Sequence, residues 1–109
     1  MAVIIKIKPL SVNVCWQGKR FKAPIYKSYE RELFLRLPKI NIPDPPFKVY
    51  YEFGFSSANS DLDNPIKPFQ DILQKKYGFN DKDIDVMIAV RKRVKKGEEY
   101  IKFSIEKIN

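Results

Sequence analysis

Prolines divide this chain into separate short segments. The run Asn41-Ile42-Pro43-Asp44-Pro45-Pro46 carries prolines at half of its positions, so it can form neither a helix nor a central strand. Pro38 ends the helical pattern that precedes this run, and Pro9 bounds the apolar start of the chain. The middle of the chain is therefore a connection, and regular elements are to be found on either side of it.

Strands are predicted where β-branched or aromatic residues run or alternate, and helices where apolar residues recur every three or four positions. The predicted strands are 3–8, 47–55, 86–90 with a basic extension over 91–96, and 100–105, and the predicted helices are 26–37 and about 66–77. Gly78 suits the C-terminal stop of the second helix. Pro68 has no N–H to donate, so the sequence leaves open whether regular helical hydrogen bonding begins near residue 66 or one turn later. The order β-α-β-α-β-β predicts an α+β fold, a single small domain over residues 1–109 with two helices packed on a mixed sheet of about four strands.

Charge and composition limit the function. The 109 residues include 21 Lys and Arg against 13 Asp and Glu, for a net charge of +8, and such a chain attracts nucleic acid. It contains no histidine, which excludes Ser-His and Cys-His catalysis and His-ligated zinc. The single Cys15 excludes an internal disulfide. We expect no membrane span and no signal peptide, because the apolar runs are short and Lys6 and Lys8 interrupt the start, and hence a cytoplasmic protein.

Carboxylates concentrate in one part of this basic chain. The run Asp61-Leu62-Asp63-Asn64 directly precedes the second predicted helix, and Lys67 and Asp81 follow it. Clustered carboxylates can hold a divalent cation against a phosphate, whereas Asp and Asn before a helix often only cap it. Lys67 has a similar ambiguity, since it could stabilise a phosphoryl transition state or simply pair with Asp63 or Asp71 at i, i+4 spacing. Both interpretations are open at this point.

The acidic run is part of a longer pattern that resembles a known family. The pattern reads Asp61-Leu62-Asp63-Asn64-x-x-Lys67-x-x-x-Asp71-x-Leu73, with Asp81 shortly beyond a Gly-aromatic pair and a basic β-hairpin at the C-terminus. The N-terminal run Pro9-Leu10-Ser11-Val12-Asn13 is similar to a Pro-Pro-Ser-Asn-Asn turn, from which it departs at Leu10 and Val12. Over nearly its whole length the chain resembles the RusA family of crossover junction endodeoxyribonucleases.

That resemblance implies a metal-dependent hydrolase that acts on DNA. Members are small homodimeric Holliday junction resolvases, commonly encoded by phages and prophages, that cut opposite strands of a four-way DNA junction, and a C₂ dimer suits that symmetry. Five residues match catalytic positions, three as ligands of Mg²⁺ or Mn²⁺, one as the essential lysine and one as the asparagine completing the motif: Asp61, Asp63, Asp81, Lys67 and Asn64. The family's acidic pair corresponds to Asn80 and Asp81, which leaves Asp83 as an alternative third ligand. Neither an organic cofactor nor a membrane is implied.

Basic and aromatic residues outside the acidic run are predicted to contact DNA. The predicted contacts lie in the N-terminal turn, around Gly18 and at strand spacing before the last strand: Asn13, Trp16, Lys19, Arg20, Lys22, Arg91, Arg93 and Lys95. The alternatives are an ordinary solvated loop with Trp16 in the core, and charges that only maintain solubility. For the whole protein, the alternatives are a non-catalytic nucleic-acid-binding protein and a nuclease directed at flaps or single strands.

Overall fold

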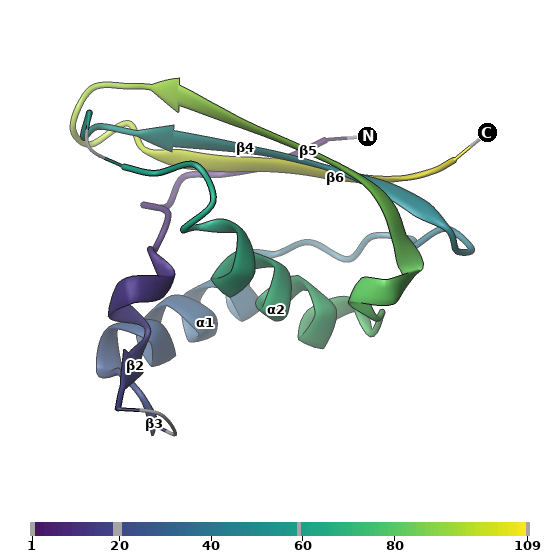
Figure 1. Ribbon diagram of the computed structural model, residues 1–109, viewed down its shortest axis with the longest axis horizontal. Coiled ribbons are helices and arrows are strands. Elements are labelled where there is room, and N and C mark those ends of the chain that lie inside the picture. Colours follow the sequence, from purple (N-terminus) through teal and green to yellow (C-terminus); the bar gives the residue numbers. More distant parts are fainter. Residues whose placement is uncertain (1, 19–20, 59, 109) are drawn as a thin grey trace.

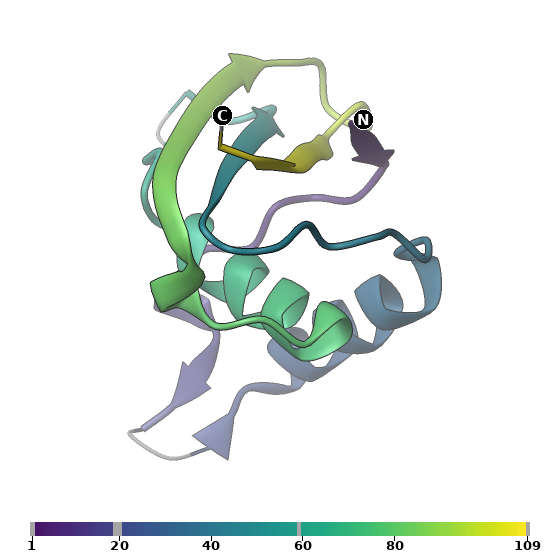
Figure 2. The ribbon, with the colours of Figure 1, turned by 90° about the vertical axis from the view of Figure 1, so that its right-hand side faces the viewer.

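A mixed sheet with two helices on one of its faces makes up most of the protein. The computed structural model describes residues 2–18, 21–58 and 60–108. The sheet has the strand order β1-β6-β4-β5, with β1 (Val3–Ile5), β4 (Phe47–Phe55), β5 (Ile84–Arg93) and β6 (Tyr100–Lys107). The helices α1 (Pro24–Arg36) and α2 (Ile66–Tyr77) lie on the same side of it in both views (Figure 1 and Figure 2). The predicted α+β fold is confirmed.

Strand β4 lies inside the sheet, between β5 and β6. It runs parallel to β5, with Phe47 beside Ile84 and Phe53 beside Arg91, and antiparallel to β6. Parallel neighbours need a long crossover connection, which α2 supplies here. Because the two strands point the same way, the residues that follow Phe55 and those that precede Ile84 emerge at opposite ends of the sheet.

Alternating side chains of β4 build the core between the sheet and the helices. The odd-numbered residues from Phe47 to Phe55 are all buried, because the pleat turns every second side chain to the same face. From α2, Phe69 packs its ring edge-on against Tyr51, Phe53 and Phe103, with centroids 5.5 to 6.2 Å apart. This aromatic cluster fixes α2 against the sheet and thereby positions both of its ends.

Some element boundaries differ from the predictions. Strand β1 ends at Ile5 instead of residue 8, because its last partner is Ile101 and β6 begins one residue before that. The predicted loop over residues 16–22 is instead a short antiparallel hairpin, β2 (Trp16–Gln17) with β3 (Phe21–Lys22). The predicted strand 86–90 is longer, since β5 already begins at Ile84 and includes the first half of the basic extension, up to Arg93.

Both helices have proline near their first residue. Helix α1 begins at Pro24 rather than at Tyr26, since the fixed φ of proline suits a first helical position. Pro68 lies in the first turn of α2, where an N–H has no intrahelical acceptor, so the helix is regular from Ile66. It ends at Gly78 in the left-handed conformation, with φ of 75°, as predicted. Neither helix in the described parts of the chain has the length and apolar character of a membrane span.

Candidate functional site

The acidic run forms the turn that leads into α2. The Asp63 carbonyl accepts a hydrogen bond from the Ile66 N–H at 3.2 Å, and the Asn64 side-chain amide donates to Asp61 Oδ2 at 3.3 Å. The N-cap position is occupied by Pro65, and no described side chain makes the cap bond. The helix-cap interpretation is therefore wrong for these residues, and the carboxylates of Asp61 and Asp63 belong to exposed residues.

The N-terminal turn lies directly against this acidic turn. The Val12 N–H donates to the Asn64 carbonyl at 2.9 Å, and the Ser11 hydroxyl accepts from the Asn13 N–H at 3.2 Å, which fixes the turn. Both turns line a pocket of about 770 Å³, where Ser11, Asn13, Asp61 and Asn64 are among the polar groups. Two runs that are distant in sequence, and that carry the family resemblance, thus share one hollow in the surface.

Two side chains in this region that could act as nucleophiles, Tyr29 and Cys15, are protonated at neutral pH. Tyr29 lines the pocket, and its hydroxyl is buried with no hydrogen bond to a described group of suitable geometry. Burial raises the pKa of Tyr29 well above its ordinary value, and the nearby Leu10 backbone only partly offsets this. The buried thiol of Cys15 donates to the Ser11 carbonyl at 3.3 Å, and burial raises its pKa to about 11. Neither group can attack as an anion at pH 7.

A cation from β5 adjoins the acidic turn. The Arg91 guanidinium donates a hydrogen bond to the carbonyl of Ser60, the residue directly before Asp61. Arg91 reaches this position because it lies beside Phe53, near the end of β4 from which the turn emerges. One of the predicted DNA-contacting residues is therefore a neighbour of a predicted metal ligand.

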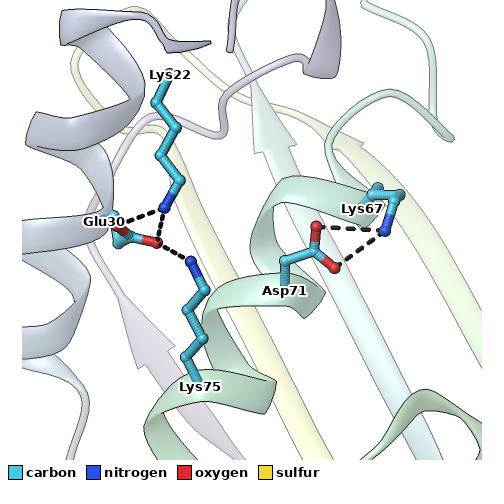
Figure 3. Close-up of polar contacts among 5 residues, drawn as sticks. All are labelled: Lys22, Glu30, Lys67, Asp71 and Lys75. Carbon is cyan, nitrogen blue, oxygen red and sulfur yellow. Dashed lines mark hydrogen bonds and ion pairs between the residues drawn. The ribbon is translucent and has the colours of Figure 1, made fainter. Parts of the chain in front are cut away.

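Lys67 lies in the first turn of α2 and pairs with Asp71. Its ammonium is 3.1 Å from Asp71 Oδ1, at i, i+4 spacing, while 72% of the lysine side chain is exposed (Figure 3). Of the two interpretations of Lys67, the simpler one, a helix-surface ion pair, is thus confirmed, and the partner is Asp71. Lys67 comes four residues after Asp63 in the sequence.

The third predicted ligand lies at the other end of α2. Asp81 follows the helix, whereas Asp63 precedes it, and twelve helical residues span about 18 Å. The sheet register agrees, because Arg91 contacts Ser60 while Asp81 comes just before Ile84, at the opposite end of β5 (Figure 1). Among the described residues, no three acidic or cysteine side chains are placed to hold one metal ion. A single chain does not bring the three predicted ligands together.

Asp81 and Asp83, the alternatives for the third ligand, have different surroundings. Both lie in a short 3-10 helix, η2 (Asp81–Asp83), and not on a strand. Asp83 Oδ2 accepts a hydrogen bond from the Asn80 N–H at 3.2 Å as part of a capping box. Asp81 is exposed, and its carboxylate has no hydrogen bond or ion pair with a described residue. Asp81 is therefore the more available ligand.

The remaining predicted DNA contacts are dispersed. Trp16 is 44% exposed and packs edge-on against Tyr26, with ring centroids 5.8 Å apart, so it is not a core residue. Arg93, at the end of β5, and Lys95, just beyond it, are exposed. The predicted contacts at positions 19 and 20, a lysine and an arginine, lie outside the described residues. The exposed members of the set stay predictions.

Sequence patterns miss Glu30, which organises the cations of the helical layer. One of its oxygens lies 3.1 Å from Lys22 Nζ and the other lies 2.9 Å from Lys75 Nζ (Figure 3). The three residues come from β3, α1 and α2, so no local spacing connects them. Lys22, predicted as a DNA contact, is therefore part of an ion-pair network.

Comparison with known proteins adds no family to these observations. No protein-family model and no curated protein matches the chain. The resemblance to the RusA family rests on the motif residues themselves.

Proposed function

We propose that this protein is a Mg²⁺-dependent endonuclease that resolves four-way DNA junctions by paired cuts on opposite strands. The observation that carries the proposal is the contact between the two motif runs, in which Val12 donates to Asn64 at 2.9 Å and both runs line one pocket. Helix capping does not account for the exposed carboxylates of Asp61 and Asp63 in this turn. The net charge of +8 favours a polyanionic substrate around them.

The oxygen donors at the start of α2 are those that Mg²⁺ prefers. Asp61 and Asp63 supply two carboxylates, and the hydrogen bond from Asn64 orients the first of them. Because Asp81 of the same chain lies about a helix length away, we infer that Asp81 of the partner subunit completes the ligand set. A C₂ dimer would complete both sites in the same way. The bound ion would neutralise phosphate charge and lower the pKa of water.

In this proposal, two cations of the chain act on the phosphate. Lys67 lies on the first turn of the helix, where its ammonium is paired with Asp71. In the proposed reaction this ammonium stabilises the negative charge that develops on the scissile phosphate. Arg91 uses one guanidinium nitrogen on the Ser60 carbonyl, and its other N–H groups, which bond to no other described residue, would donate to phosphate oxygens. Both groups therefore favour binding of the reacting phosphate close to Asp61 and Asp63.

The test compares Asp63→Asn with the wild type on labelled four-way junctions. We expect the variant to bind the junction and to leave it uncut, because the amide keeps the shape of the side chain and removes its charge. Asp44→Asn is the matched control, since Asp44 is exposed in the connection before β4, and it should cut like the wild type. Cutting by Asp63→Asn, or by the wild type in excess chelator, would contradict the proposal.

A non-catalytic nucleic-acid-binding protein is the second candidate. It is favoured by the separation of Asp81 from Asp61 and Asp63 within one chain. A wild-type protein that binds junctions in Mg²⁺ without nicking them would support it. Flap and single-stranded substrates in the same experiment separate a junction resolvase from the third candidate, a flap or single-strand nuclease.

A further inference from the structure

Cations from three elements converge on a groove between α1 and α2. We call it the basic groove, and it has a volume of about 470 Å³ and is lined by Lys22, Lys27, Glu30, Arg31, Phe34 and Lys75. Four cations against a single carboxylate give it a net charge of +3. The groove shares no lining residue with the pocket that Asp61 and Asn64 line.

Glu30 arranges two of these cations before any ligand arrives. Burial alone raises the pKa of its carboxyl, but the hydrogen bonds from Lys75 and Lys22 outweigh that and hold the pKa below its ordinary value. Glu30 is therefore ionised at neutral pH and holds both ammoniums, and Lys22 also lies over the Tyr26 ring at 5.4 Å. Cations that are already ordered lose less side-chain entropy when they bind an anion.

Two further cations in the basic groove are uncommitted. The side chains of Lys27 and Arg31 are exposed on α1 and have no hydrogen bond or ion pair with another described residue. A guanidinium can donate two parallel hydrogen bonds to a phosphate, and an ammonium adds a point charge. The composition of the groove thus suits an anion with several oxygens, because one carboxylate cannot neutralise four cations.

Helix α2 connects the acidic turn at its start with the basic groove. Lys67, Asp71 and Lys75 follow each other at i, i+4 and i+8, and their side chains lie on the face that also meets Glu30 (Figure 3). Lys75 comes nine residues after Ile66, which corresponds to about 14 Å along the helix axis, and Asp63 lies three residues before Ile66 in the preceding turn. A duplex rises 3.4 Å per base pair, so the span from Asp63 to Lys75 corresponds to about five base pairs.

We propose that the basic groove binds the phosphate backbone of a junction arm, about five base pairs from the scissile phosphate. The proposal rests on the proposed function for the identity of the DNA partner. It assigns Lys27 and Arg31 as direct phosphate contacts, with Lys22 and Lys75 beside them. Glu30 is the positioning residue of this set.

The test measures how junction affinity depends on salt in Ca²⁺, which permits binding without cutting. The groove variant is Lys27→Gln/Arg31→Gln. The control is Lys48→Gln/Lys102→Gln, which removes the same charge from the other face of the sheet, where β4 and β6 residues alternate with the buried set. Log affinity falls as log salt rises, so this slope is negative. We expect it to become less negative by about two units in the groove variant and to stay unchanged in the control.

Neutral methylphosphonate linkages locate the contact on the DNA. Placed about four to six base pairs from the cut, they should weaken binding of the wild type and have little effect on the groove variant. An unchanged slope in the groove variant, an equal loss of slope in the control, or equal sensitivity of both proteins to the neutral linkages would overturn the proposal. A wild type that binds but does not cut in Mg²⁺ contradicts only the proposed nuclease, because the salt slopes of the groove variant and the control still decide whether the groove binds DNA. A wild type that does not bind the junction overturns both.

Discussion

Mixing two inactive variants should restore cutting if the metal site is shared between subunits. Asp63→Asn removes a carboxylate at the start of α2, and Asp81→Asn removes one beyond its end. The helix separates these positions by about 18 Å, whereas ligands of a single Mg²⁺ lie within about 2.1 Å of it. Each variant alone therefore lacks a ligand at both sites of its homodimer, and both should be inactive.

In a heterodimer of the two variants, the missing ligands are distributed differently between the two metal sites. One of its sites carries both substitutions, and the other carries neither. After refolding together in equal amounts, random pairing makes about half of the dimers heterodimers, so about a quarter of all sites should be intact. Asp63→Asn refolded with the control Asp44→Asn should instead give about half intact sites.

A supercoiled plasmid with an extruded four-way junction separates these outcomes. Paired cuts by wild-type dimers give linear plasmid, while a heterodimer with a single intact site gives nicked circles. We expect the Asp63→Asn and Asp81→Asn mixture to nick at about a quarter of the wild-type rate without linear product. Absence of nicking in this mixture, while the Asp44→Asn mixture cuts, would refute the shared site. Cutting by Asp81→Asn alone would remove that residue from the ligand set.

Two further predictions concern stability. The lowered pKa of Glu30 means that its ionised form stabilises the fold above its ordinary pKa of 4.5 and that this contribution is lost as the pH falls through the folded value. Glu30→Gln should therefore lower the free energy of unfolding at pH 7 by about 1 kcal/mol for two partly exposed ion pairs, and in thermal melts the gap to the wild type should shrink as the pH falls below 4.5 and close below the lowered pKa of the folded state; a gap independent of pH contradicts this account. A Cβ at Gly54 would overlap the Tyr100 ring, whose hydroxyl donates to Glu52, so Gly54→Ala should cost about 1–3 kcal/mol in urea unfolding. The cost should shrink in a Tyr100→Ala background, and an equal cost there would show that the ring is not the cause.

Much of the local structure follows from residues close together in sequence. The alternation from Phe47 to Phe55 and the stop at Gly78 were predictable, because a pleat and a left-handed cap depend on neighbouring residues. The hairpin at Trp16 was not, since its two-residue strands are too short for a periodic pattern. The start of α1 was missed because apolar spacing begins at Tyr26, after the proline that opens the helix.

The features of the candidate site also divide into those that the sequence predicts and those that only the tertiary structure reveals. Sequence alone identified the acidic run, Lys67 and the strongly basic charge, and the absence of histidine excluded Ser-His and Cys-His catalysis and His-ligated zinc. Only the tertiary structure decided that Val12 meets Asn64, that Asp81 lies beyond the far end of α2, and that Glu30 joins cations of β3 and α2. The physical reason is that residue type and spacing control contacts within about one helical turn. Which distant residues meet depends instead on the parallel register of β4 and β5 and on the direction in which α2 crosses between them.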